Sequence, residues 1–229
     1  MSDVVVLGGG GDMARVAVTK LLTLDDECGL TLADRDAGAA ERLAAELGGG
    51  RLDVRQVDIF DPALLREAVS GARLVMNCTG PYYRTARPVL EACVESGVDY
   101  VDMCDDEDSA LSLLELDARA REGGVLALIC CGIAPGLLNV LARSAADALD
   151  ETRDIELAWV SGQTPPVEGK PAGSVGVIEH VLHCCVGDCA TVRGGRRTHV
   201  PAFTYGKVIG FPQPLGPYRV FELGHAEPA

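Results

Sequence analysis

The chain has 229 residues and is acidic, with 20 Lys and Arg against 34 Asp and Glu and a formal net charge of −14. This length allows one large or two small domains with a core that needs no disulfides, and a hydrophobic content of 48% excludes a disordered chain. The acidic balance argues against a nucleic-acid partner, because phosphate binding requires a positive field.

Nine cysteines are many for this length. Two vicinal pairs, Cys130–Cys131 and Cys184–Cys185, lie inside apolar runs, which is typical of buried thiols in a reducing compartment. The N-terminus shows no basic stretch followed by a long apolar run. The longest apolar segment, Val125–Ala142, is interrupted by glycine, proline and asparagine. We therefore expect a cytoplasmic protein with no membrane partner.

The first two thirds of the chain alternate β-branched runs with amphipathic helical runs, which predicts a parallel sheet with crossover helices. The expected strands are Val4–Leu7, Leu30–Ala33, Leu52–Val57, Leu74–Met76, Val98–Val101 and Val125–Ile129. The expected helices are Met13–Leu22, Ala37–Leu47, Pro62–Val69, Arg87–Ser96 and Asp106–Glu122. This order predicts an α/β fold, a Rossmann domain with a doubly wound parallel sheet, over residues 1–133.

From residue 134 to residue 229 the pattern changes to a mixed α+β region, which we predict to be a second domain. Its expected elements are a helix at Leu137–Leu149, a strand at Ile155–Val160, a loop at Ser161–Ser174, a helix at Val175–Val186 and a last strand at Val220–Leu223. Short strands divided by Gly and Pro lie between, and Arg193–Arg197 predicts a charged hairpin turn.

The glycine-rich segment between the first strand and the first helix is the strongest local signal. Gly9, Gly11 and Ala14 satisfy the G-x-G-x-x-A pattern of dinucleotide-binding turns. Gly9 permits the tight turn, Gly11 lets the backbone approach a pyrophosphate, and Ala14 lets helix and strand pack closely. With Asp12 and Met13 at the helix start, these residues are candidates for cofactor binding. The alternative is a glycine-rich turn without a ligand.

Two acids follow the next strands. Asp34 ends the second strand and can accept both ribose hydroxyls of an adenosine, which favours NAD and repels a 2′-phosphate. The neighbouring Arg35 can stack on adenine or pair with that phosphate, so the predicted cofactor is NAD or NADP, with NAD slightly favoured. Asp58, after the third strand, either contacts the adenine amino group or is a turn residue.

The loop after the fourth strand contains Cys78, Thr79, Gly80 and Pro81. Ligands of such sheets bind outside the carboxyl ends of the strands, so this loop is expected to face the ribose and nicotinamide of the cofactor. Gly-Pro is also a plain turn signal, which is the alternative.

Four motifs occur in an order that resembles the saccharopine dehydrogenase-like family, in the branch with an N-terminal NAD(P)-binding domain. They are the turn at Gly9–Ala14, Asn77–Pro81, Gly97–Asp102 and Cys131–Leu137. The resemblance covers residues 3 to 145 and weakens afterwards, where His225-x-Glu227 is still similar to the family pattern.

This resemblance implies an NAD(P)-dependent oxidoreductase that transfers hydride at a C–N bond of an amino-acid-derived substrate. It also implies that the second domain carries substrate contacts and a dimer surface. Members of the family are longer, and their chain returns to complete the first domain. We therefore expect a truncated second domain and a homodimer or a complex with a completing chain.

Five further residues are candidates for chemistry. Asp102, which ends the fifth strand, is the best-placed group for a proton relay, with capping of the following acidic helix start as the alternative. In the family the motif at Cys131 lines the cleft between the domains, so Cys131 is a proton-transfer candidate or a buried structural thiol. Tyr82, Tyr83 and Arg84 are candidate substrate contacts, because an aromatic ring can pack on nicotinamide and a guanidinium can bind a carboxylate.

The segment from His180 to Cys189 has a metal-like spacing, since His180 and Cys184, and Cys185 and Cys189, are four residues apart. Apolar residues interleave and no C-x-x-C pair is present, so an amphipathic helix is favoured and no metal is expected.

Three functions fit these observations: a saccharopine-type dehydrogenase, a non-catalytic NAD(P)-binding module, and an enoyl reductase on the same scaffold. A hydrophobic substrate requires an apolar tunnel lined from Trp159 to Phe221, whereas an amino-acid substrate requires basic side chains facing the cleft.

Overall fold

A computed structural model describes residues 3–25, 27–48, 50–160 and 175–229. The chain divides into two compact units, of which the first comprises Met1–Cys104 and Asp108–Cys131. The second comprises Gly132–Ala229 together with the short segment Asp105–Glu107. The domain boundary between residues 133 and 134 stays a prediction.

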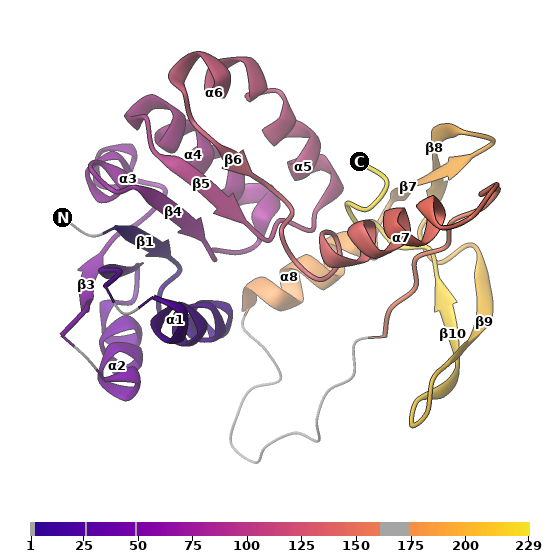
Figure 1. Ribbon diagram of the computed structural model, residues 1–229, viewed down its shortest axis with the longest axis horizontal. Coiled ribbons are helices and arrows are strands. Elements are labelled where there is room, and N and C mark those ends of the chain that lie inside the picture. Colours follow the sequence, from indigo (N-terminus) through magenta and orange to yellow (C-terminus); the bar gives the residue numbers. More distant parts are fainter. Residues whose placement is uncertain (1–2, 26, 49, 161–174) are drawn as a thin grey trace. The chain divides into compact units, whose positions relative to one another are not determined.

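The first unit contains a six-stranded sheet in the order β3-β2-β1-β4-β5-β6 (Figure 1). All neighbouring strands are parallel, and Val4 of β1 lies opposite Leu30 of β2 and Leu74 of β4. The strands are β1 Val4–Leu7, β2 Leu30–Asp34, β3 Leu52–Gln56, β4 Leu74–Asn77, β5 Asp99–Asp102 and β6 Ala127–Leu128. The order reverses at β1, which confirms the doubly wound Rossmann fold.

Helices connect these strands, and some of them begin at a side-chain cap. They are α1 Asp12–Leu24, α2 Ala37–Leu47, α3 Pro62–Val69, α4 Tyr82–Ser96, α5 Glu107–Leu114 and α6 Asp117–Gly123. The Asp36 side chain accepts from the Ala39 N–H at the start of α2, and Asp61 does the same for Ala63 and Leu64 at α3.

Two predicted helices were wrong in extent. The helix expected at 106–122 is two helices, because Leu116 turns inward, is buried and starts a new helix in α6. The helix expected to begin at Arg87 begins at Tyr82. Pro88 lies inside α4, although proline is more typical of a first helical turn.

Two apolar clusters cover the two faces of the central strand. Val5 and Leu7 belong to one cluster, and Val4 and Val6 belong to the other, as alternation along a strand requires. The first face packs on residues of α3 and α4, and the second on residues of α1 and α2. The core thus lies on both sides of β1, whose carboxyl end leads into the glycine-rich turn.

In its described residues, the second unit contains two helices and two antiparallel hairpins (Figure 1). The elements are α7 Leu137–Asp147, α8 Val175–Cys184, β7 Asp188–Arg193, β8 Arg196–Pro201, β9 Gly206–Phe211 and β10 Gly216–Phe221. The α+β character is confirmed, and the β7–β8 hairpin turns at Gly194 and Gly195 as expected for the charged segment.

The strand expected at Ile155–Val160 was wrong, because these residues form no regular element. Ile155, Leu157 and Trp159 are exposed, and among the described residues no strand pairs with them. The loop expected at 161–174 lies outside the described residues. No helix within the described ranges is long and apolar enough to cross a membrane.

Candidate functional site

The turn between β1 and α1 packs directly against the ends of β2 and β4. Gly8 has a φ of +74°, and a Cβ added there would lie 2.8 Å from the carbonyl oxygen of Cys78. A Cβ on Gly9 would lie 2.8 Å from Leu32 Cα and 2.9 Å from the Ala33 nitrogen. These two positions therefore require glycine, because any side chain would displace backbone.

The start of α1 is open to an anion. Gly11 is the extended N-cap and supplies no side-chain cap, so the first N–H groups of the helix keep their donors available. Gly11, Asp12 and Met13 are exposed there, whereas Ala14 is buried under the sheet. A glycine cradle followed by an uncapped helix start fits the pyrophosphate of a dinucleotide.

Asp34 fixes the glycine turn to the end of β2. Its Oδ2 accepts from the Gly10 N–H at 2.9 Å, and its Oδ1 accepts from the Asp36 N–H at 2.9 Å. A carboxylate retains further lone pairs for a ribose hydroxyl. Arg35 beside it is exposed. Asp58 accepts from the Phe60 N–H at 3.0 Å and so acts as a turn residue, while its contact with adenine stays a prediction.

The loop after β4 is held by Asn77, which is fully buried. Asn77 Oδ1 accepts from the Thr79 N–H at 3.0 Å and from the Thr79 hydroxyl at 2.6 Å, and its Nδ2 donates to the Tyr100 hydroxyl at 3.1 Å. Burial raises the pKa of the Cys78 thiol to about 12, so this thiol is protonated at neutral pH. Gly80 is exposed, and the peptide bond between Gly80 and Pro81 is cis.

Asp102 is buried, with 1% of its surface exposed. It accepts from the Tyr100 hydroxyl at 2.7 Å, the Cys104 N–H at 3.0 Å and the Cys130 N–H at 2.7 Å. Burial raises the pKa of Asp102, against the opposing effect of these hydrogen bonds. Cys130 has a φ of 59°, an uncommon conformation that the bond to Asp102 holds. Asp102 thus positions the end of β6, while its role as a proton relay stays a prediction.

The remaining candidates lie around this network. Cys131 is exposed, and its N–H donates to the Asp102 carbonyl at 2.9 Å. Partial burial, Asp102 and Cys130 raise the pKa of its thiol, so the thiol is protonated at neutral pH. The Tyr82 hydroxyl donates to the Asn77 carbonyl at 3.2 Å and its ring packs on the core, whereas Tyr83 and Arg84 are exposed at the start of α4.

Sequence reasoning missed Asn77, Tyr100 and Phe60 as site residues. Asn77 stands in the motif at the end of β4, which is the signal that marks it, and Tyr100 lies on the neighbouring strand. The Arg84 guanidinium lies 5.7 Å from the centre of the Phe60 ring, a contact that no spacing indicates.

The family of the chain follows from this geometry and from a match of its sequence to a family model. Residues 4–128 match the model of the saccharopine dehydrogenase NADP-binding domain. The chain belongs to this family. Over 155 residues it is 28% identical to the Synechocystis sp. carboxyaminopropylagmatine dehydrogenase. This alignment covers 63% of this chain and 38% of that protein.

Two further relatives carry oxidoreductase names. The trans-acting enoyl reductase of Mycobacterium tuberculosis is 26% identical over 175 residues, or 70% of this chain and 42% of that protein. The saccharopine dehydrogenase-like oxidoreductase of Mus musculus is 37% identical over 89 residues, or 38% of this chain and 20% of that protein. The chain thus spans less than half the length of each of these relatives.

A solved structure supports the fold. The apo saccharopine dehydrogenase (L-Glu forming) of Saccharomyces cerevisiae aligns with a TM-score of 0.65 at 17% identity, over 98% of this chain and 50% of that chain. Homodimer formation, or assembly of this family member with a second chain, stays a prediction.

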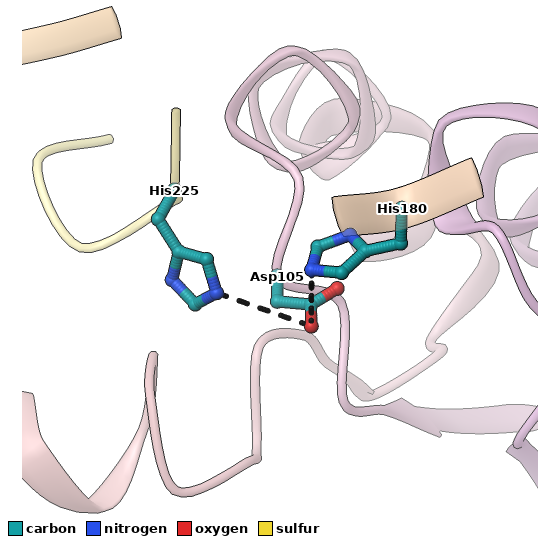
Figure 2. A group of neighbouring side chains, drawn as sticks. All are labelled: Asp105, His180 and His225. Carbon is teal, nitrogen blue, oxygen red and sulfur yellow. Dashed lines mark ion pairs between the residues drawn. The ribbon is translucent and has the colours of Figure 1, made fainter. Parts of the chain in front are cut away.

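The second unit holds a cluster of acids and histidines, of which Figure 2 shows Asp105, His180 and His225. Nδ1 of His180 lies 2.9 Å from Asp106 Oδ1, and Nε2 of His180 lies 3.3 Å from Asp105 Oδ2. His225 Nδ1 lies 2.7 Å from Glu227 Oε2. Burial alone would lower the pKa of His180, but Asp106, Cys184 and Asp105 together raise it to about 10.

The segment from His180 to Cys189 was predicted to lie on one helix, and the structure confirms this for only part of it. His180 and Cys184 share one face of α8, with Sγ 3.5 Å from Nε2. The helix ends at Cys184, however, and Cys189 lies on β7 with its thiol donating to the Val200 carbonyl, so Cys185 and Cys189 do not share a helix. Sequence reasoning missed Asp105 and found His225 only as part of a family pattern.

Proposed function

We propose that this chain is an NAD(P)-dependent oxidoreductase that transfers hydride at a C–N bond of an amino-acid-derived substrate. The observation that carries the proposal is the convergence of two loops, since the Gly8 backbone packs on the Cys78 carbonyl. The anion-binding start of α1 and the Thr79–Pro81 loop therefore share one edge of the sheet, where such folds bind dinucleotides. The names of the relatives support oxidoreduction.

Each segment at this edge of the sheet would bind a different portion of the cofactor. The start of α1 would hold the pyrophosphate, Asp34 a ribose, and the Thr79–Pro81 loop the nicotinamide end. When bound, the nicotinamide supplies the hydride donor or acceptor. The chain itself positions both partners, because Asn77 and Asp102 lock the loop and the end of β6 in place.

For the proton step we propose Cys131 as the donor and Asp102 as its positioning residue. Cys131 presents an exposed thiol that stays protonated at neutral pH, and Asp102 holds the backbone on both sides of the Cys130–Cys131 bond. Arg84 and Tyr83 are exposed at the start of α4, where a guanidinium and a helix N-terminus both favour a carboxylate. This favours an amino-acid-derived substrate.

The choice between NAD and NADP is proposed to depend on Asp34 and Arg35. The family model is named for NADP, and the predicted preference for NAD has no support from the relatives. Asp34→Asn retains an acceptor for the Gly10 N–H but removes the charge that repels a 2′-phosphate, so it should shift binding towards NADP. Arg35→Ala should shift binding towards NAD. Equal affinities for both nucleotides in both variants would contradict this proposal.

A second candidate function is enoyl reduction. It is favoured by the relative named trans-acting enoyl reductase, whose match reaches 70% of this chain. The two functions separate in a spectrophotometric assay of NAD(P)H consumption, with an amino acid plus a keto acid in one arm and an enoyl thioester in the other. Turnover of the enoyl thioester alone would replace the C–N proposal.

Calorimetric titration with NAD⁺, NADH, NADP⁺ and NADPH tests the central claim. A folded sample should bind at least one of them saturably. The absence of saturable binding to all four by a sample with native circular dichroism would overturn the proposal. Binding without turnover of either substrate class would favour the non-catalytic module.

A further inference from the structure

Three side chains of the second unit converge from three separate segments (Figure 2). Asp105 precedes α5, His180 lies on α8, and His225 follows β10. Asp105 Oδ2 lies 3.3 Å from His180 Nε2 and 4.0 Å from His225 Nε2, and the three groups offer ligand atoms within 4.8 Å of one another. Ligand atoms at the usual bond lengths around a tetrahedral Zn²⁺ lie about 3.3 Å apart. The first pair has this spacing, and the second reaches it with a shift of less than an ångström.

Each imidazole is backed by a second carboxylate on its other nitrogen. His180 Nδ1 lies 2.9 Å from Asp106 Oδ1, and His225 Nδ1 lies 2.7 Å from Glu227 Oε2. A simple ion pair needs only one carboxylate for each histidine. A carboxylate on Nδ1 fixes one proton there, so an ion that displaces the Nε2 proton would meet a lone pair facing the shared centre, which is the outer-shell arrangement of metal-binding histidines.

Among the described residues of the cluster, acids outnumber histidines. Asp105, Asp106 and Glu227 supply three carboxylates against two imidazoles, and Glu227 Oε1 is buried with no hydrogen-bond partner among the described residues. A buried carboxylate oxygen without a hydrogen-bond partner destabilises a folded chain, and a dication at the centre would offset the negative charge of these acids. The Asp105 side chain is 28% exposed, which leaves a solvent-facing side for a further ligand.

A second set of groups, Asp106, His180 and Cys184, shares His180 with the first. The Asp106 side chain is fully buried, so this set offers no open side. An ion held at Nδ1 would also leave Asp105 and His225 without a role. The first set is therefore favoured.

We infer that Asp105, His180 and His225 form a binding site for a divalent transition-metal ion, with Zn²⁺ as the best match. Two imidazoles and one carboxylate suit Zn²⁺ and its neighbours, whereas Mg²⁺ and Ca²⁺ prefer oxygen ligands alone. The ion ties together the segment before α5, helix α8 and the segment after β10.

The test is a Zn²⁺ titration of the chelator-treated full chain against a chromophoric zinc chelator, in excess Mg²⁺ to displace ions from the acidic surface. Wild type should bind one ion per chain. Asp105→Asn and His225→Gln should each lower the affinity at least 100-fold. Glu227→Gln should lower it about 10- to 100-fold and serves as the test if a ligand variant fails to fold. His183→Gln, on the same helix but outside the cluster, should bind as wild type does.

Trp159 gives a second readout, since this only tryptophan has its ring centre 5.4 Å from that of His225. One equivalent of Co²⁺ should quench its fluorescence in wild type and His183→Gln, but not in His225→Gln. Zn²⁺ binding that Mg²⁺ abolishes, or equal loss in His183→Gln and His225→Gln, would overturn the site. So would loss of binding in Cys184→Ser with retention in Asp105→Asn, which would assign the ion to the second set.

Discussion

Each of the two units of the chain is ordered by different interactions. In the first unit all four residues of β1 are buried, and apolar clusters fill both faces of the sheet. In the second unit no residue of α7 is buried, and the buried side chains include a histidine, His225, that faces acids. Apolar side chains therefore surround the polar groups of the first unit, where a lost acceptor leaves buried donors unpaired, whereas Asp105 of the second unit is partly exposed and shares its histidine with a second acid. Loss of polar partners should affect the two units differently.

The largest expected effect comes from a buried acid of the first unit. Asp102→Ala removes the acceptor of two buried donors and one partly buried donor, so we expect the free energy of unfolding to fall by about 3 kcal/mol or more. In the metal-free chain, Asp105→Ala should cost less than about 1 kcal/mol, because His180 keeps Asp106. Urea unfolding followed by circular dichroism measures both, and equal losses would break the comparison between the units.

A smaller effect separates folding from binding within the first unit. Gly9→Ala places a Cβ against the backbone of Leu32 and Ala33 and should lower the free energy of unfolding by about 1–3 kcal/mol. In Gly11→Ala the Cβ meets only the Gly8 carbonyl oxygen, at 3.3 Å, so the fold should persist. The affinity for NAD(P) should nevertheless fall tenfold or more, because the added methyl blocks the pyrophosphate.

Thermal unfolding measures the stability of both variants, and calorimetry measures their affinity for NAD(P). Gly123→Ala is the matched control, since its Cβ would make only ordinary contacts beside α4. Its nucleotide affinity should equal that of wild type. Full affinity in Gly11→Ala would remove the turn from the binding site.

The smallest effect concerns thiol reactivity at the edge of the sheet. Cys131 is exposed and should react with iodoacetamide before the half-buried Cys78 and the buried Cys93, since burial raises the pKa of both these thiols to about 12. Because the pKa of Cys131 is also raised, its rate should be below that of a free thiol at pH 8 and should increase as the pH rises. Mass spectrometry of digests gives the order, and earlier labelling of Cys78 would contradict the packing of the β4 loop.

Most of the first unit could be predicted because its signals are local. Asp61 followed by proline marks the start of α3, and the glycine turn follows a buried strand. The division between α5 and α6 could not be predicted, since Leu116 is an ordinary apolar residue and no glycine or proline interrupts the pattern. Helix periodicity continues across such a turn and conceals it.

The second unit was less predictable because its contacts are long-range. Residues 155–160 have strand-like composition, but a strand also needs a neighbour, which local sequence does not specify. Asp105, His180 and His225 stand far apart in the sequence, so no spacing pattern contains them together. Likewise, Asp102 looked like a free acid at a strand end, and only the fold reveals its three donors.

The position of the segment Asp105–Glu107 in the chain affects how related genes can recombine. It is encoded within the nucleotide-binding half, yet it belongs to the second unit, where Glu107 pairs with Arg197 and accepts from the Ala190 N–H at 3.1 Å. A recombination event between codons 131 and 132 would exchange the second unit without these three acids. Viable chimaeras of related genes should therefore keep the donor's acidic triplet, and the two parts of the gene are expected to evolve as a linked pair.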